Sequence, residues 1–181
     1  SGDAEAALVA RVARGDRAAF ADLVARHQHA LSAYAQRMLG DVAQAEDVVQ
    51  ETFLRLWSRA DRFRPEKAKL STWLHNIAHN LCIDGFRTAK RMTYTDTPED
   101  VAREGDDPQT RRSEAERAAR VRDAIAALPE RQRSALLLCH YQGLSNRDAA
   151  GILDVSVDAL ESLLSRGRRT LRQQLETDYE R

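Results

Sequence analysis

The chain has few of the residues that build sheets. Its 181 residues include only eight glycines and four prolines, and aromatic residues make up 6% of the total. Ala, Arg, Leu, Glu and Asp dominate and β-branched residues are sparse, a composition that favours helices over strands. We therefore expect an all-α protein with little or no sheet.

Disulfide frameworks and membrane spans are also lacking. The two cysteines, Cys82 and Cys139, have no paired spacing, which indicates a reducing compartment. The longest apolar run, near residues 135–139, is too short to cross a bilayer, and no signal-peptide pattern opens the sequence. We expect a cytoplasmic protein with no direct membrane insertion.

Neither sign of charge is in excess, because 28 Lys and Arg residues balance 28 Asp and Glu residues. Many free DNA-binding proteins are basic overall, so any nucleic-acid affinity of this chain must come from local basic patches. Catalytic patterns are missing as well: nothing resembles a nucleophile with its base, a phosphate-binding loop or a pair of catalytic carboxylates. We expect neither an enzyme nor a bound cofactor.

An acidic segment divides the chain into two parts. Residues 93–110 hold two prolines and six acidic residues against one arginine, with no apolar period. Such a composition is typical of a flexible linker, and we assign residues 93–117 to it. The linker joins a small helical domain of residues 4–92 to a second one of residues 118–178.

The stretch from Glu46 to Trp57 predicts a helix with two unlike faces. At about 100° per residue, one face of this helix is apolar. The opposite face carries acidic and amide side chains that surround a leucine. That pattern is typical of a surface that binds a partner. An ordinary amphipathic helix with one exposed leucine would show the same pattern. The residues of the face are Asp47, Gln50, Glu51 and Leu54.

A basic loop follows and leads into a helix predicted from Leu70 to about Arg91. Cations alternate with aromatic rings there, an arrangement that suits single-stranded nucleic acid with unstacked bases. Asn80 offers an amide to a base edge. Trp73 as a core anchor and Asn80 as a surface amide are the plain structural alternatives. The candidate residues are Arg62, Phe63, Arg64, Lys67, Lys69, Trp73, Asn80 and Arg87.

The C-terminal part predicts a helix-turn-helix. Ser145 opens a short helix, Asp154 marks a tight turn, and Ser156 caps a longer helix. Hydroxyls and guanidiniums on the outer face of the longer helix suit base edges and phosphates, although a solvated basic helix would look similar. The candidate DNA-contacting residues are Arg147, Glu161, Ser162, Ser165, Arg166 and Arg169.

One helix face carries a possible set of metal ligands. His75, His79 and Cys82 are spaced i, i+4, i+7, a spacing that would suit three ligands of one ion. The sequence offers no evident fourth ligand nearby. We therefore assign no metal site and keep these three residues as a minor alternative.

Together these segments resemble the extracytoplasmic-function (ECF) group of bacterial sigma factors in the sigma-70 family. The resemblance is carried by a DxxQExF core, the segment STWLHNIAHNLCIDGFR after the basic loop, the acidic linker, and LPERQRSALLL, GLSNRDAAGIL and SVDALESLLSRGRRTLR near the end. It implies a subunit that binds RNA polymerase core through the clamp coiled coil and the flap and reads promoter DNA. It also implies an anti-sigma factor that holds the protein inactive and that, if membrane-bound, recruits it to the inner membrane.

The resemblance also implies roles for single residues. Asp47, Gln50, Glu51 and Leu54 would dock on the clamp coiled coil, and the basic loop with Trp73 and Asn80 would open the −10 region. Ser162, Ser165 and Arg166 would contact the −35 element. The sequence departs from the family at Glu161 and Leu163, where many members carry basic residues, which leaves the −35 sequence open.

Two other classes of function stay open from the residues alone. A stand-alone helix-turn-helix regulator could sense a ligand or metal through His75, His79 and Cys82, and it would bind an operator tightly as a dimer. A purely structural helical adaptor would show no dependence on DNA.

Overall fold

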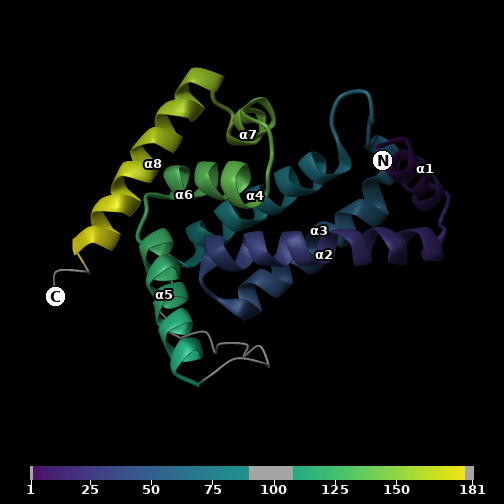
Figure 1. Ribbon diagram of the computed structural model, residues 1–181. Helices are drawn as coiled ribbons and strands as arrows, with labels where there is room; N and C mark the ends of the chain where they lie inside the picture. The colour runs from purple at the N-terminus through teal and green to yellow at the C-terminus, as the bar shows by residue number, and fades with distance from the viewer. Residues whose placement is uncertain (1, 90–107, 178–181) are drawn as a thin grey trace.

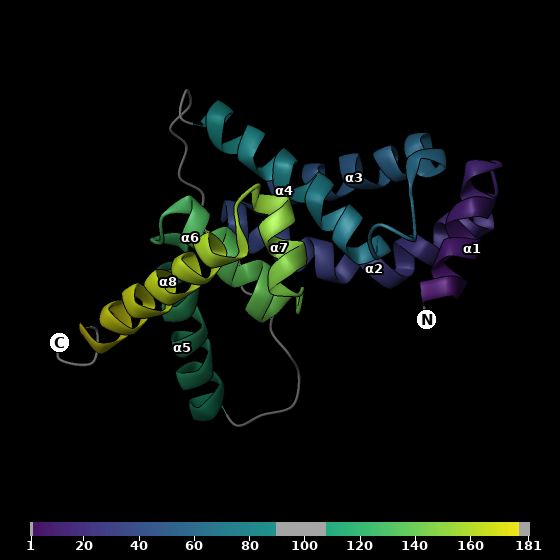
Figure 2. The same cartoon turned by 90° about the horizontal axis from the view of Figure 1, so that it is seen from above.

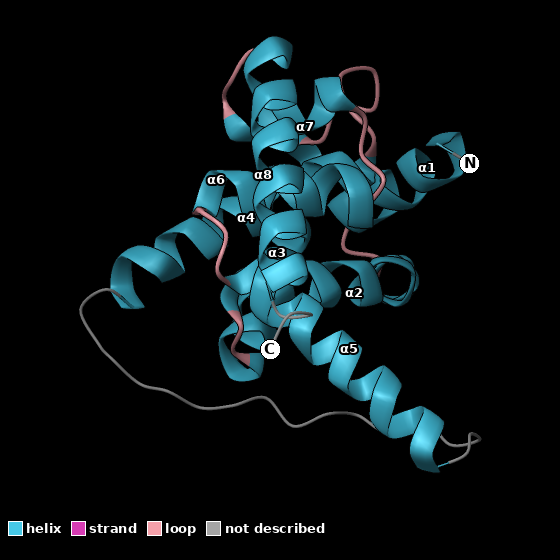
Figure 3. Ribbon diagram, turned by 60° about the vertical axis from the view of Figure 1, so that its left-hand side comes forward, coloured by secondary structure: helices cyan, strands magenta, loops and turns pink. Residues whose placement is uncertain are grey.

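The structure, a computed structural model, describes residues 2–89 and 108–177 (Figure 1). Every regular element in these two ranges is a helix, as the colouring of Figure 3 shows. The all-α prediction is therefore confirmed. Within the same ranges, no helix is both long and apolar enough to cross a membrane.

The N-terminal domain is built on helices that start at aspartate caps. Asp16 accepts hydrogen bonds from the backbone at the start of α2, and Asp41 does the same for α3. Gly40 ends α2 in the left-handed region at φ 68°, which turns the chain back so that α3 packs along α2. The elements are α1 (Gly2–Ala13), α2 (Arg17–Leu39), α3 (Val42–Arg59), the 3₁₀ helix η1 (Ala60–Arg62) and α4 (Leu70–Ala89).

The C-terminal domain contains the predicted helix-turn-helix. Its elements are α5 (Pro108–Ala126), α6 (Glu130–Leu136), the π-helix η2 (Leu137–Tyr141), α7 (Asn146–Leu153) and α8 (Val157–Thr177). The backbone N–H of Asp148 donates to Ser145 Oγ at 3.1 Å, and that of Ala159 donates to Ser156 Oγ at 3.1 Å. Asp154 turns the chain between α7 and α8 with φ 54°. Both predicted caps and the predicted turn are present.

Helix α5 begins earlier than the sequence analysis placed it. It starts at Pro108, so residues 108–117 of the predicted linker are helical. Proline suits the first position of a helix, and Arg112 and Glu116 form an i, i+4 ion pair at 3.5 Å. Residues 93–107 of the linker, and the predicted end of α4 near Arg91, lie outside the described residues.

The two domains pack against each other. Helix α4 contacts α7, and α2 contacts α5, α6 and η2; the view from above shows α7 beside α4 (Figure 2). His75 Nε2 lies 3.2 Å from Gln142 Oε1, and the Arg37 guanidinium lies 4.6 Å from the centre of the Tyr141 ring. Buried apolar side chains of both domains form one continuous cluster. In this arrangement one side of α4 is covered by the C-terminal domain.

Candidate functional site

The predicted partner surface on α3 faces solvent. Asp47 and Gln50 are exposed, and Leu54 is 60% exposed. Glu51 is partly exposed and accepts a hydrogen bond from Arg55 Nε at 3.1 Å. We call Asp47, Gln50, Glu51 and Leu54 the α3 patch.

The opposite side of α3 holds this helix in the core. Thr52, Phe53 and Leu56 are buried, and the Thr52 hydroxyl donates to the carbonyl oxygen of Val48 at 2.7 Å. The hydroxyl is thus satisfied within its own helix. Since burial of a leucine or phenylalanine side chain stabilises a fold by about 1.5–3 kcal/mol, the α3 patch stands on a firmly anchored helix.

The basic loop between α3 and α4 is anchored by its aromatic residue. Phe63 is only 8% exposed and packs edge-on against Trp73, with 5.7 Å between ring centres. Arg64 Nη1 donates to the carbonyl oxygen of Asp61 at 2.7 Å, which fixes the loop backbone. Phe63 therefore supports Trp73 and has little ring surface for a ligand, while Trp73 is half-buried. The predicted cations Arg62, Arg64, Lys67 and Lys69 are all exposed.

Each domain has a hollow at its surface. The hollow on the C-terminal domain has a volume of about 490 Å³, and the one on the N-terminal domain, beside the basic loop, has a volume of about 460 Å³. Its wall includes Phe63, Pro65 and Lys69 of the loop together with Glu5 and His27. His27 Nε2 lies 2.7 Å from Glu5 Oε1. Glu5 and His27 are not among the residues predicted from the sequence, because no local pattern indicates that positions 22 apart in separate helices meet.

Asn80 lies on the exposed side of α4. Its side-chain amide donates to Asn76 Oδ1 at 3.4 Å, and both residues are exposed. Asn80 is seven positions after Trp73, so the two lie on the same side of the helix, two turns apart. The side chain of Arg87 lies outside the described residues.

The outer face of α8 is open to solvent along its first four turns. The predicted residues Glu161, Ser162, Ser165, Arg166 and Arg169 are all exposed, and so is Arg147 on α7. The apolar side of α8 is held by Leu160, Leu164 and Gly167, which are buried against the rest of the domain. Hydroxyl, carboxylate and guanidinium groups thus share one solvent-facing helix surface.

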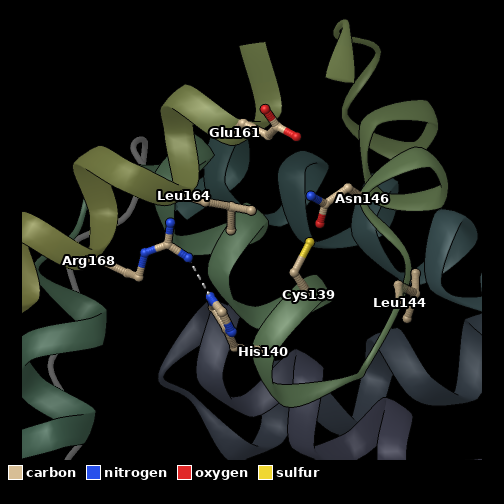
Figure 4. A pocket seen from close by; sticks show the side chains of 7 residues that line it. All are labelled: Cys139, His140, Leu144, Asn146, Glu161, Leu164 and Arg168. Carbon is tan, nitrogen blue, oxygen red and sulfur yellow. Dashed lines mark hydrogen bonds between the residues drawn. The ribbon is translucent and has the colours of Figure 1, made fainter. Parts of the chain in front are cut away.

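Arg168 lies on α8 two turns after Glu161, and both side chains line a hollow of about 490 Å³ that also includes Cys139, Asn146 and Leu164 (Figure 4). Arg168 Nη1 lies 3.1 Å from His140 Nε2. Burial raises the pKa of the Cys139 thiol, which makes it a poor nucleophile. The hydrogen bond between Arg168 and His140 ties α8 to η2 at this hollow.

The three metal-ligand candidates have other environments. His75 Nδ1 lies 2.7 Å from the carbonyl oxygen of Ser71, and His79 Nδ1 lies 2.9 Å from the Tyr34 hydroxyl. Burial raises the pKa of the Cys82 thiol to about 12, which disfavours the thiolate that binds metals. Across residues 2–89 and 108–177, no group of three or more His, Cys, Asp or Glu side chains could hold a metal ion.

Comparisons with known proteins assign both domains. Residues 23–92 match Sigma-70 region 2, and residues 118–171 match Sigma-70, region 4. The ECF RNA polymerase sigma factor SigW of Bacillus subtilis (strain 168) is 32% identical over 92% of this chain and 94% of its own length. The chain belongs to the sigma-70 family, as an ECF RNA polymerase sigma factor. Sigma factors are non-enzymatic transcription initiation factors, so the expectation that the protein is not an enzyme is confirmed.

Solved structures of other sigma factors have the same arrangement of helices. The structure of CnrH in complex with the cytosolic domain of CnrY matches 97% of this chain and 99% of that chain, with 30% identity and a TM-score of 0.74. CnrH of Cupriavidus metallidurans is an RNA polymerase sigma factor. The sigma factor RpoE in complex with the anti-sigma factor NepR, from Bartonella quintana, matches 88% of this sigma factor at 25% identity, with a TM-score of 0.72.

Proposed function

We propose that this ECF sigma factor binds RNA polymerase core and directs it to promoters whose −10 and −35 elements are read by its two domains. The observation that carries the proposal is the presence of two exposed nucleic-acid-type surfaces on separate domains. One is the loop–α4 surface with its cations, Trp73 and Asn80, and the other is the outer face of α8. The α3 patch lies on another helix than the loop–α4 surface, and it would bind the polymerase.

The α3 patch has the composition of a protein-docking surface. An exposed leucine surrounded by acidic and amide groups supplies an apolar anchor with a polar rim, which is how binding energy is commonly concentrated at interfaces. We assign the clamp coiled coil of the polymerase as its partner and the flap as the partner of the C-terminal domain. Leu54, at 60% exposure, is the expected anchor.

The loop–α4 surface would read the −10 element as a single strand. Unstacking a base costs a few kcal/mol, and stacking on an aromatic ring returns about 1–3 kcal/mol per base. Trp73 is the half-buried ring available for stacking, with Phe63 packed against it. Arg62, Arg64, Lys67 and Lys69 would hold the strand's phosphates, and Asn80 would read a base edge. The hollow beside the loop, lined by Phe63 and Lys69, would lie next to the bound strand.

The outer face of α8 would read the −35 element in the major groove. An arginine such as Arg166 can bind guanine O6 and N7 in a bidentate manner, and the serine hydroxyls can bond to either kind of base edge. Glu161 would accept a hydrogen bond from a cytosine amino group. Arg147 and Arg169 would contact phosphates, which position the helix without reading sequence.

The proposal requires the domains to separate on the promoter. Elements centred about 25 base pairs apart are about 85 Å apart along the duplex, at about 3.4 Å per base pair. In the structure α7 packs against α4, so the two reading surfaces are much closer than that. Holding each domain on the polymerase raises its effective concentration at its own element, which explains how a chain of zero net charge could select promoters.

We further propose that an anti-sigma factor keeps the protein inactive in the cytoplasm. The support is that CnrH and RpoE were solved as complexes, with the cytosolic domain of CnrY and with the anti-sigma factor NepR. Such a partner would cover the α3 patch or the DNA-reading faces. If that partner is a membrane protein, it would recruit the sigma factor to the inner membrane.

A footprint of the reconstituted holoenzyme tests this assignment. Core polymerase with the wild-type protein should protect both elements of a selected promoter, while the protein alone should protect neither at the same concentration. Gln50→Ala with Leu54→Ala should abolish both footprints through loss of core binding, and Arg166→Ala should weaken the upstream footprint selectively. Equal protection by the free protein would instead favour a stand-alone helix-turn-helix regulator.

A further inference from the structure

Two histidines are buried where the domains meet and have no part in the proposed function. His75 and His79 on α4 are 2% and 6% exposed. His75 Nε2 contacts the side-chain amide of Gln142, which belongs to the C-terminal domain. His79 Nδ1 lies 2.9 Å from the Tyr34 hydroxyl, and Ser134 of α6 lies near enough to that hydroxyl to oppose the rise in its pKa. Both imidazoles therefore belong to a polar network that crosses the domain junction.

We propose that these two histidines make the packing of the domains sensitive to acid. Their protonation releases the C-terminal domain from α4 and α2, so a fall in pH inside the cell favours the separated form of the sigma factor. We call the arrangement with packed domains the closed form and the separated one the open form. Each buried imidazole is tolerated in the closed form because it is neutral and hydrogen-bonded.

The groups that face His79 disfavour a positive charge there. The Tyr34 hydroxyl on α2 lies 2.9 Å from His79 Nδ1, and the cation Arg131 acts on His79 from α6. The thiol of Cys82, one turn along α4, acts on that hydroxyl. Burial, with a smaller contribution from Arg131, lowers the pKa of His79 from 6.5 to about 4. A proton on His79 would thus be placed in a buried site against a cation of the other domain.

His75 has a similar but more polar environment. Burial lowers the pKa of His75, hydrogen bonds to Ser71 and Gln142 oppose that shift, and His27 on α2 adds to it. The junction also includes the cations Arg37 and Arg133. Its carboxylates include Asp148 of α7, whose Oδ2 accepts a 3.4 Å hydrogen bond from Thr72, one turn before His75, and Glu130, which acts on Arg133. His79 is therefore the main acid-sensitive group, and His75 adds to its effect.

The direction of the effect follows from proton linkage. A histidine with a lowered pKa in the closed form favours that form above its ordinary pKa, and the preference is lost as the pH falls toward the closed-form pKa. For His79 the window runs from 6.5 down to about 4. Between about pH 7.5 and about pH 5.5, protonation of this residue alone raises the ratio of open to closed protein by about tenfold.

Small-angle X-ray scattering of the full-length chain at a series of pH values tests the proposal. The inference rests on the proposed function only for its consequence at promoters, because the scattering needs neither polymerase nor DNA. The radius of gyration should rise between about pH 7.5 and about pH 5 while the helical circular dichroism signal is retained. An unchanged radius would overturn the proposal, and so would an increase accompanied by loss of helix, which reports unfolding.

Matched variants assign the effect to the junction. His79→Asn keeps an acceptor for the Tyr34 hydroxyl but cannot be protonated in this range, so it should stay compact at the acidic end. His29→Asn changes an exposed histidine on α2 and should expand like the wild type. Arg131→Glu, at an exposed position, should reduce the expansion, because a carboxylate in place of the cation stabilises protonated His79 in the closed form. Expansion of His79→Asn equal to that of the wild type would refute the assignment.

Discussion

The guanidinium of Arg133 in α6 donates a 2.6 Å hydrogen bond to the backbone carbonyl oxygen of Met38, near the end of α2. The same guanidinium donates to the carbonyl oxygens of Ile125 and Leu128, both at 3.1 Å, and lies 5.4 Å from the centre of the Phe86 ring. Carbonyl groups at helix ends lack partners within their own helix. One side chain thus satisfies the end of α5 and joins the C-terminal domain to the N-terminal one.

Arg133→Ala should therefore destabilise the protein strongly. Hydrogen bonds to a charged group contribute about 1.5–3 kcal/mol, and the substitution removes several together, so we expect a loss of at least about 2 kcal/mol in the free energy of unfolding. Urea denaturation measures this loss. Arg120→Ala, at an exposed position of α5, is the control and should change stability by less than about 0.5 kcal/mol. Equal stabilities of the two variants would contradict the role of Arg133.

Gly167 is needed because α8 approaches α6 closely. A Cβ atom at this position would lie 2.8 Å from Leu136 Cδ1, so Gly167→Ala should cost about 1–3 kcal/mol through overpacking. Gly151 in α7 has no atom within 4 Å of its Cβ position. Gly151→Ala should therefore stabilise the domain by up to about 1 kcal/mol, as alanine in a helix usually does. Thermal unfolding of both variants tests the close approach of α8 to α6. A higher melting temperature for Gly167→Ala would contradict that close approach.

The docking role of the α3 patch predicts a loss of polymerase binding without loss of fold. Gln50→Ala and Asp47→Ala remove exposed side chains, and Leu54→Ala removes the exposed apolar anchor, which should weaken core binding by about tenfold or more. Surface plasmon resonance with immobilised core polymerase measures the affinity. Gln28→Ala, at an exposed position of α2, should bind like the wild type. Unchanged affinity for core polymerase in all three patch variants would contradict the docking role of the α3 patch.

The −35 assignment predicts a change in base preference from one arginine. Arg166→Ala should cost about 1–3 kcal/mol at a promoter with the preferred upstream sequence, and it should relax the preference at one base position. Competition among promoters randomised in the upstream element measures both effects. Arg172→Ala, further along α8 and also exposed, should preserve the preference. A preference profile identical to the wild type in Arg166→Ala would argue against base reading by this residue.

Local patterns predicted much of this structure. The caps at Ser145 and Ser156 and the outward position of Leu54 follow from residue type and helical period, and the structure contains all of them. These features depend on neighbours in sequence. The helical start at Pro108 was missed because the acidic composition before it obscured a good first-turn proline.

Contacts between distant segments could not be predicted in the same way. The interpretation of His75 and His79 as possible metal ligands used their spacing on one helix, while their actual partners, Gln142 and Tyr34, lie on other elements. Likewise, Arg133 looks like an ordinary surface cation in the sequence, and only the packing of α6 on α2 gives it the carbonyl oxygen of Met38 as a partner. Pairing across domains is determined by tertiary packing and leaves no local pattern.

Run-off transcription with purified bacterial core polymerase tests the central claim most directly. The template is a pool of genomic promoter fragments, transcribed with and without this sigma factor. Specific transcripts should appear only when both components are present, and they should be lost when Leu54→Ala and Gln50→Ala are combined. The absence of specific transcripts and of a complex with core, together with tight binding of the free protein to duplex DNA, would contradict it.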